Sequence, residues 1–346
     1  MDTGRRIRAF AKLGNTLAMY GDGGVSQWNS LLDEAVDKAL QDNAWFTGES
    51  VKTMLSAIGE SLQKEDLEQW IAGYNLPEKM PGQNVAVVMA GNVPAVGFHD
   101  LLCVLISGNR LYAKLSSDDK QLLPAMCDIL KQEEPGFAGM IRFTEDKLTG
   151  FDAVIATGSN NTSRYFNYYF GKYPHIIRKN RNGIAVLTGN ESGTELNSIG
   201  KDIFTYYGLG CRNVSKLFVP VGYDLRLFLD AMQPFEKVGD HHKYRNNYDY
   251  NKSIYLVNGD KHFDNGFLLL KEDTSMASPV SVLFFEPYSG IDALNDLIRR
   301  ESENIQCVVS IDKNVHGAIP PGTTQHPKLW DYADGVDTMK FLVSAC

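Results

Sequence analysis

The sequence predicts a two-lobed α/β protein with a helical N-terminal segment. From residue 84 onward, short apolar runs such as 85–90 alternate with helix-like segments, as in a parallel sheet whose strands are buried on both faces. Before residue 77, apolar residues recur at helical spacing. The length of 346 residues is enough for a substantial core and two domains.

The N-terminal helices are expected between residue 3 and about residue 76. Apolar positions repeat through Ile7, Phe10 and Leu13 and again through 31–40. Breaks are predicted at residues 21–24, 47–48 and 75–81. Three tryptophans in this segment are interpreted as packing anchors, and they are Trp28, Trp45 and Trp70.

The first lobe is expected to hold three strands, at residues 85–90, 110–115 and 151–156. An apolar helix follows the first strand and ends before Gly108. Ser117 is expected to cap a helix that runs to about residue 132. The third strand runs directly into the turn Thr157-Gly158-Ser159, which opens a helix rich in aromatic residues.

The second lobe begins near residues 175–190 and repeats the alternation. Its expected strands lie near residues 176–177, 184–187, 216–221, 253–257, 280–285 and 306–311, and its expected helices at 194–207, 225–232 and 291–300. The polar and aromatic stretch 236–250 is interpreted as a long loop, and the tail after Pro320 has no clear period. We therefore predict a first domain over residues 1–183, a second over 184–320, and a tail over 321–346 that packs back on the body.

The composition argues against several classes of function. A net charge of −8 and a pI near 5.4, without a long basic run, argue against nucleic-acid binding as the main activity. No stretch approaches about 18 uninterrupted apolar residues, so no membrane span is expected. The N-terminus is basic but lacks a following apolar stretch, so no signal peptide is expected and the protein is predicted to be cytoplasmic.

The cysteines are too scattered for a disulfide framework or a zinc site. They number five, lie far apart and form no CxxC pair, at positions Cys103, Cys127, Cys211, Cys307 and Cys346. Cys211 differs from the others because it follows two glycines in the turn YYGLGCRN, residues 206–213. Gly208 and Gly210 allow positive φ and close backbone approach, which would present the thiol, and Arg212 would lower its pKa. The alternative is a buried cysteine in a tight turn.

Three further features belong to the first lobe. Asn92 lies on the loop after the first strand, where its amide and the Cys211 N–H would together make an oxyanion hole. Lys114, at the end of the second strand, is placed to reach a ribose or phosphate, unless it is only a solvated strand-end lysine. The Thr157-Gly158-Ser159 turn opens a helix, whose N-terminus favours phosphate.

Other motifs are absent or uninformative. The sequence contains no GxGxxG, no phosphate-binding P-loop and no GxSxG. His241 and His242 are adjacent and lack metal-ligand spacing, so they are interpreted as loop residues.

In combination these motifs resemble the aldehyde dehydrogenase superfamily. The segments that carry the resemblance are VAVVMAGNVPAVGFHDLLCVLISGNRLYAKLSS, FDAVIATGSNNTSRYF and FTYYGLGCRNVSKLFV, and they lie within residues 84–310. The resemblance implies a Rossmann-like cofactor domain followed by an α/β catalytic domain. It implies Cys211 as nucleophile and Asn92 as oxyanion donor. It also implies that Lys114 contacts the cofactor ribose and that Gly158 and Ser159 form the pyrophosphate turn.

Departures from the superfamily pattern point to acyl-CoA reductases. Hydrolytic members carry a general-base glutamate in an E-L-G-G motif upstream of the cysteine, whereas residues 177–183 here contain no carboxylate. An enzyme without that base suits acyl transfer to or from coenzyme A. The glutamate that grips the ribose hydroxyls is also absent, because Ser117 stands in its region, which favours NADPH over NADH. The E-F-G-P segment survives only as SMASP, residues 275–279.

The closest resemblance is to the fatty acyl reductases of bacterial luminescence. It implies NADPH-dependent reduction of an acyl thioester, carried by CoA or by a protein, to an aldehyde through a thioester on Cys211. An acyl-activating partner enzyme and a homo-oligomer are left open. Two alternatives are a cysteine-dependent acyltransferase or thioesterase without nicotinamide, and a catalytically silent partner subunit.

Overall fold

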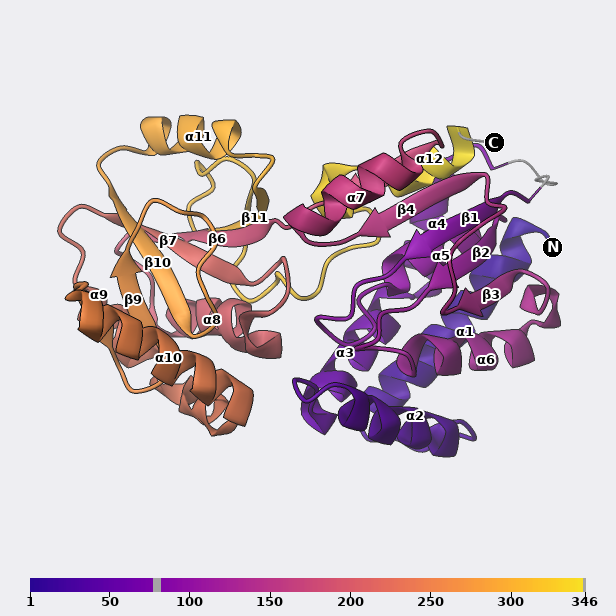
Figure 1. Ribbon diagram of the computed structural model, residues 1–346, viewed down its shortest axis with the longest axis horizontal. Helices are drawn as coiled ribbons and strands as arrows, with labels where there is room; N and C mark the ends of the chain where they lie inside the picture. The colour runs from indigo at the N-terminus through magenta and orange to yellow at the C-terminus, as the bar shows by residue number, and fades with distance from the viewer. Residues whose placement is uncertain (77–81, 345–346) are drawn as a thin grey trace. The chain divides into compact units, whose positions relative to one another are not determined.

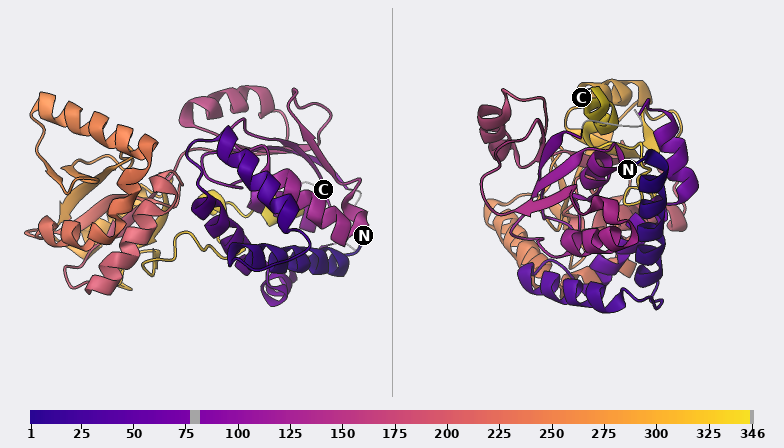
Figure 2. Two further views of the ribbon diagram at one scale, coloured as in Figure 1. Left: turned by 90° about the horizontal axis from the view of Figure 1, so that it is seen from below. Right: turned by 90° about the vertical axis from the view of Figure 1, so that its right-hand side faces the viewer.

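The computed structural model describes residues 1–76 and 82–344, which form two compact units. The first unit comprises Met1–Lys179 together with Pro327–Cys346, and the second comprises Asn180–His326. The N-terminal helix α1 and the C-terminal helix α12 therefore belong to the same unit (Figures 1 and 2). The predicted break at 75–81 falls partly on residues outside the described range, as does Cys346.

Four helices open the first unit, as the periodicity predicts. They are α1 (Thr3–Gly21), α2 (Asn29–Asp42), α3 (Gly48–Ser61) and α4 (Lys64–Ala72). Helices α1 and α3 approach closely because Gly59 lacks a side chain. A Cβ at Gly59 would lie 2.4 Å from the backbone nitrogen of Ala18. Of the three tryptophans, Trp70 is fully buried, and Trp28 and Trp45 are half-buried against the same core.

A five-stranded parallel sheet forms the centre of the first unit, in the order β3-β2-β1-β4-β5. Its strands are β1 (Asn84–Val88), β2 (Arg110–Lys114), β3 (Ile141–Thr144), β4 (Ala153–Thr157) and β5 (His175–Arg178). The chain winds outward from β1 on one side and from β4 on the other. The carboxyl ends of β1 and β4 therefore flank a topological switch point, which is where doubly wound folds bind ligands.

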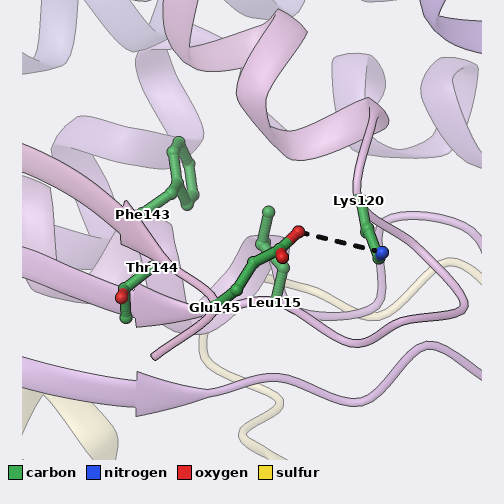
Figure 3. A pocket seen from close by; sticks show the side chains of 5 residues that line it. All are labelled: Leu115, Lys120, Phe143, Thr144 and Glu145. Atoms are coloured by element: carbon green, nitrogen blue, oxygen red, sulfur yellow. Dashed lines mark ion pairs between the residues drawn. The ribbon is translucent and has the colours of Figure 1, made fainter. Parts of the chain in front are cut away.

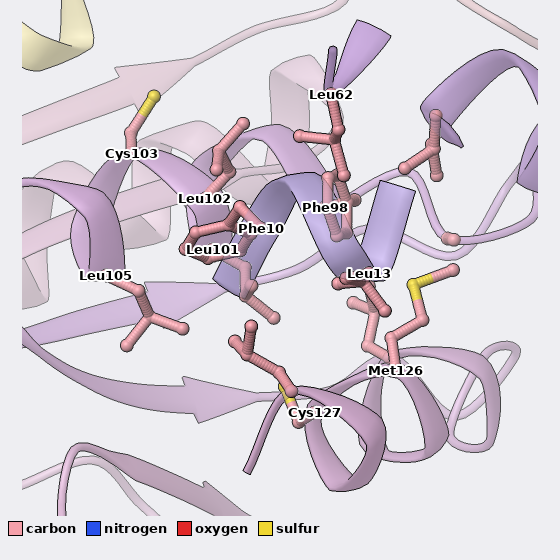
Figure 4. Packing of buried hydrophobic residues seen from close by; sticks show 14 of the residues in the cluster. Phe10, Leu13, Leu62, Phe98, Leu101, Leu102, Cys103, Leu105, Met126 and Cys127 are labelled. Carbon is pink, nitrogen blue, oxygen red and sulfur yellow. The ribbon is translucent and has the colours of Figure 1, made fainter. Parts of the chain in front are cut away.

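Both faces of this sheet are buried, which explains the continuous apolar runs in its sequence. Val85 and Val87 belong to the large core on one face, whereas Ala86 packs on the other face with Phe166. The first core includes α5 (Phe98–Ile106), which Figure 4 shows beside side chains of α1 and of α6 (Leu122–Glu133). Helix α7 (Asn160–Phe170) covers the second face.

The second unit contains a seven-stranded mixed sheet in the order β12-β11-β6-β7-β10-β9-β8. Its strands are β6 (Asn182–Val186), β7 (Val214–Pro220), β8 (His262–Asp264), β9 (Leu269–Glu272), β10 (Val282–Tyr288), β11 (Ile305–Val309) and β12 (Ala318–Ile319). All neighbouring strands are parallel except the pair β8 and β9. The helices are α8 (Gly193–Phe204), α9 (Leu225–Ala231), α10 (His242–Asn258) and α11 (Ile291–Arg300).

The prediction for residues 236–257 is wrong. The expected loop at 236–250 overlaps the 3-10 helix Gln233–Asp240 and the first half of α10, and the expected strand at 253–257 is the end of α10. Buried Tyr244, Tyr248 and Tyr255 lie at helical spacing, so aromatic rings supply the apolar face of this helix. Residues 242–258 are polar in composition, but the burial of their tyrosine rings stabilises them as a helix.

The C-terminal tail packs on the first unit. Its residues Leu329, Tyr332, Met339 and Leu342 are buried in that unit's core. The Tyr332 hydroxyl accepts a hydrogen bond from Trp70 Nε1 at 2.7 Å. The tail ends in a helix, α12 (Thr338–Ser344), which its sequence did not predict. Its first residue, Thr338, accepts a hydrogen bond from the buried Arg178 guanidinium at 2.9 Å.

Candidate active site

The structure brings the predicted first-unit residues to one edge of the sheet. Asn92 follows β1, Lys114 and Ser117 lie at the end of β2 and just after it, and Thr157-Gly158-Ser159 ends β4 and opens α7. These three strands are adjacent and parallel, so their carboxyl ends share an edge. Asn92 and Ser159 are far apart in the sequence, and the strand order brings the loops that carry them to the same edge of the sheet.

The loop that carries Asn92 is fixed on both sides of that residue. Asn43 Nδ2 donates a hydrogen bond of 3.2 Å to the Gly91 carbonyl. Gly91 must be glycine, because a Cβ there would lie 2.6 Å from Ser116 Oγ. Beyond Asn92, Ala95 has a φ of 50°, and its N–H donates to a buried carboxylate of Asp119. The Asn92 side chain itself is exposed.

The turn after β4 combines a helix N-terminus with tight packing. Ser159 is the N-cap of α7, and its Oγ accepts a hydrogen bond from the Thr162 N–H at 3.2 Å. A Cβ at Gly158 would lie 2.8 Å from the Phe166 ring, so a side chain is excluded there. The 11-residue helix α7 starts at the switch point of the sheet, where its dipole favours an anionic group.

Lys114 ends β2 and Ser117 lies in the loop after it, but Ser117 does not cap a helix. The expected cap is wrong, because α6 begins only at Leu122 and its N-cap residue is Gln121. Ser117 is exposed, and Lys114 Nζ donates to the Asp146 carbonyl at 3.4 Å.

A small pocket opens beside this loop (Figure 3). Its lining residues are Leu115, Lys120, Phe143, Thr144 and Glu145. Lys120 Nζ lies 3.8 Å from a Glu145 carboxylate oxygen. Lys120 therefore adds a second positive charge, after Lys114, at the ends of β2 and β3, and Glu145 neutralises part of it.

Cys211 lies in the second unit, in the turn between α8 and β7, and it is exposed. The turn before it is left-handed at three successive residues, because Tyr206, Tyr207 and Gly208 have φ values of 54°, 58° and 75°, and this strains the two tyrosines but not the glycine. The expectation for Gly208 is confirmed. The two tyrosines before Gly208 also adopt left-handed conformations, which the sequence did not predict.

Asn213 holds this turn, and sequence reasoning missed it. Its Oδ1 accepts a hydrogen bond from the Gly210 N–H at 2.8 Å. Its Nδ2 donates to three backbone carbonyls at the end of α8, those of Asp202 at 3.0 Å, Ile203 at 3.3 Å and Thr205 at 2.8 Å. The side chain is 2% exposed. Neither this burial nor the bonds to the end of α8 can be read from the local sequence, so no sequence signal identifies Asn213.

Replacing Asn213 by alanine is expected to destabilise the second unit by about 2–4 kcal/mol, because buried carbonyls and an N–H lose their partner. The measurement is the midpoint of chemical unfolding. Asn190→Ala, at an exposed asparagine of the same unit, is the matched control and should leave the midpoint unchanged. Equal midpoints for the two variants would show that Asn213 does not support the turn.

Arg212 influences a second thiol beside the turn. Cys307 Sγ donates to the Arg212 carbonyl at 3.5 Å. Burial raises the pKa of Cys307 to about 12, against the opposing effect of the Arg212 charge. Cys307 is therefore protonated at neutral pH and is no nucleophile. A lowering of the Cys211 pKa by Arg212 stays a prediction.

The strand that follows Cys211 holds the segment that resembles E-F-G-P. Ser215 Oγ donates to the Met276 carbonyl at 2.8 Å. Lys216 is fully buried, and its Nζ donates to the Asp273 carbonyl and, at 2.7 Å, to Glu286 Oε2. Residues 275–279 are thus tied to β7 within the same unit as Cys211.

His241, which the sequence marks beside His242, has a structural role. His241 is the N-cap of α10, and its ring centroid lies 4.3 Å from that of Tyr207. Over residues 1–76 and 82–344, no group of three or more His, Cys, Asp or Glu side chains could hold a metal ion. Within the same residues, no helix is both long enough and apolar enough to cross a membrane.

Solved structures show where this architecture occurs. One is an aldehyde dehydrogenase from Physcomitrella patens, in complex with the reaction product succinate. The match covers 100% of this chain and 84% of that one, with a TM-score of 0.68 and 12% sequence identity. A putative aldehyde dehydrogenase from Burkholderia cenocepacia matches 90% of this chain and 75% of its own, at 0.66 and 11%. An aldehyde dehydrogenase from Bacillus cereus, in complex with NAD+, matches 90% and 73%, at 0.62 and 14%.

Comparison of sequence alone finds no counterpart, since no protein-family model and no curated protein matches the chain. The likeness therefore rests on the arrangement of strands and helices, at identities of 11–14% in these three structures. The match extends over both units, because it covers at least nine tenths of the chain in each of them. This chain has the fold of the aldehyde dehydrogenases.

Proposed function

We propose that this protein is an oxidoreductase that reduces an acyl thioester to an aldehyde with a nicotinamide cofactor. The observation that carries the proposal is an exposed cysteine, Cys211, on a turn held by Asn213 in a chain of aldehyde dehydrogenase fold. The segment 177–183 supplies no carboxylate to activate water. Its Arg178 is buried and paired with Asp100. Without that base, an acyl group on Cys211 resists hydrolysis.

Cys211 and Asn92 would divide the chemistry of acyl transfer. The Cys211 thiolate attacks the carbonyl carbon, a C–S bond forms to the enzyme, and the C–S bond to coenzyme A breaks with departure of its thiolate. During the attack the carbonyl oxygen gains negative charge. The Asn92 amide and the Cys211 N–H would donate hydrogen bonds to it. Release of the aldehyde would return Cys211 to its thiolate form.

The carboxyl edge of the first-unit sheet fits a dinucleotide. The start of α7 at Thr157-Gly158-Ser159 would hold the pyrophosphate, and Lys114 and Ser117 would hold a ribose. When bound there, the cofactor supplies the hydride that converts the acyl group to an aldehyde. The chain's own contribution is to bind and orient it.

The decisive experiment follows two products in one reaction. The protein is incubated with acyl-CoA species of graded length and with NADPH or NADH, and both CoA release and cofactor oxidation are measured. A reductase oxidises one cofactor for each CoA released. CoA release without cofactor oxidation would instead identify a thioesterase or acyltransferase. An acyl-carrying protein in place of acyl-CoA tests the alternative donor, and an acyl-activating partner would add to the rate.

NADPH is proposed as the preferred cofactor because Ser117 stands where a ribose-gripping glutamate would repel a 2′-phosphate, and Lys114 and Lys120 lie at the same end of β2. A serine can donate to a 2′-phosphate, and Lys114 and Lys120 can attract it. Glu145 partly offsets Lys120. A glutamate at position 117 would accept bonds from ribose hydroxyls and repel the phosphate.

Ser117→Glu is therefore expected to shift the ratio of kcat/KM for NADPH over NADH toward NADH by about tenfold to a hundredfold, equivalent to about 1–3 kcal/mol. The ratio is measured for both cofactors on the parent and the variant. Ser159→Ala, at the other end of the proposed site, should weaken both cofactors alike. A parent that already prefers NADH, or an unmoved ratio, would rule out this role for Ser117.

A further inference from the structure

We propose that Asp119 is a positioning residue that holds the Asn92 loop in its working conformation through a buried carboxylate. The proposal rests on the proposed function only for the role of Asn92. Asp119 belongs to the loop after β2, whereas Asn92 belongs to the loop after β1. The contact therefore couples the ribose side of the sheet edge to the oxyanion side.

The contact is short, buried and directed at a strained residue. Asp119 is 3% exposed, and its Oδ2 accepts the Ala95 N–H at 2.6 Å. Ala95 has a φ of 50°, in the left-handed region that alanine rarely adopts. A residue persists there only when its surroundings enforce it. The Asp119 carboxylate is the group that binds its N–H.

The carboxylate stands on a rigid support. Its loop leads directly into α6, whose first residue, Leu122, is 1% exposed. On the other side of Asn92, the Gly91 carbonyl is held by Asn43 at the end of α2. Asn92 thus projects from a short span fixed at both ends, and Asp119 supplies one of the two fixed points.

The buried carboxylate of Asp119 lowers the stability of the folded protein at neutral pH. Burial raises its pKa to about 6, while the Ala95 and Leu122 N–H groups lower it and the Asp42 charge raises it. Because the folded-state pKa lies above the unfolded one, the folded protein loses stability as pH rises from about 4 through 6. A group that weakens the fold at neutral pH yet binds a strained loop points to a functional role.

The charged groups around Asp119 are consistent with its pKa of about 6. The charge of Asp42, at the end of α2, acts on Asp119, and Gln121 Nε2 donates a hydrogen bond to Asp42 Oδ2 at 2.8 Å. On its own loop Asp118 and Lys120 are exposed, and Lys120 lies beside Glu145. Among the described residues, Asp119 Oδ1 has no hydrogen-bond partner and can take up a proton. The neutral acid would hold the Ala95 N–H more weakly.

The first test is hydrogen exchange, which needs no substrate. In the parent protein, protection of the peptide covering residues 91–97, corrected for intrinsic rates, should fall about tenfold or more between pH 8 and pH 5. In Asp119→Asn it should be low at both pH values. Asp128→Asn, an exposed aspartate of α6, should behave as the parent. Protection independent of pH in the parent, or unchanged in Asp119→Asn, would overturn the proposal.

The second test uses activity. Asp119→Asn should lower kcat about tenfold at pH 8 with little change in the KM for the cofactor, and should remove an acid limb near pH 6 from the rate profile. In an Asn92→Ala background the same substitution should have almost no effect, because it acts through Asn92. Multiplicative losses would mean that Asp119 acts otherwise. A protein that reduces no thioester but shows the exchange pattern would reject the proposed function and retain this one.

Discussion

Cys211→Ala is expected to abolish aldehyde formation while leaving cofactor affinity nearly unchanged. The thiolate is the group that forms the bond to the acyl carbon, and alanine offers no replacement for it. The cofactor would be held by residues of the first unit, whereas Cys211 belongs to the second. The loss should therefore appear as a missing chemical step and not as a binding defect.

Labelling with radioactive acyl-CoA tests this prediction directly, in the absence of reduced cofactor. The parent protein should retain label after denaturation, and Cys211→Ala should retain none. Cys307→Ala is the matched control, because Cys307 interacts with the same turn but is buried with a pKa raised to about 12. It should label like the parent. Stable label on Cys211→Ala, with loss of label on Cys307→Ala, would move the nucleophile to Cys307.

Asn92→Ala is expected to lower kcat by about a hundredfold to a thousandfold, the effect of removing one oxyanion donor. Its side chain is exposed and its loop is held by Asn43 and Asp119, so the fold should be unaffected. Acylation and reduction both pass through a tetrahedral oxyanion, so both steps should slow.

Single-turnover acylation and steady-state reduction, measured on the same preparation, check this expectation. Unfolding midpoints of parent and variant should agree. Asn258→Ala, at an exposed asparagine near the end of α10, is the control for a neutral amide deletion. If Asn92→Ala keeps most of its activity, Asn92 only shapes its loop.

Local sequence predicts the elements whose surroundings are uniform. Strands β1 and β4 are buried on both faces, so they appear as apolar runs. The short strands β3 and β8 lie at sheet edges with partly exposed side chains, so no such run marks them. Helix α10 escapes prediction because its buried face is made of tyrosines that also count as polar.

The sequence by itself determined the α/β class, the order of the loops that carry Asn92, Lys114 and Ser159, and the unusual setting of Cys211, because all of these follow from local pattern. Only the tertiary structure decided which loops share an edge, since strand order depends on pairings between distant segments. It also decided the roles of Asn213 and Asp119. Each of these two side chains acts through backbone groups that the chain brings near only when folded, and no local pattern records that.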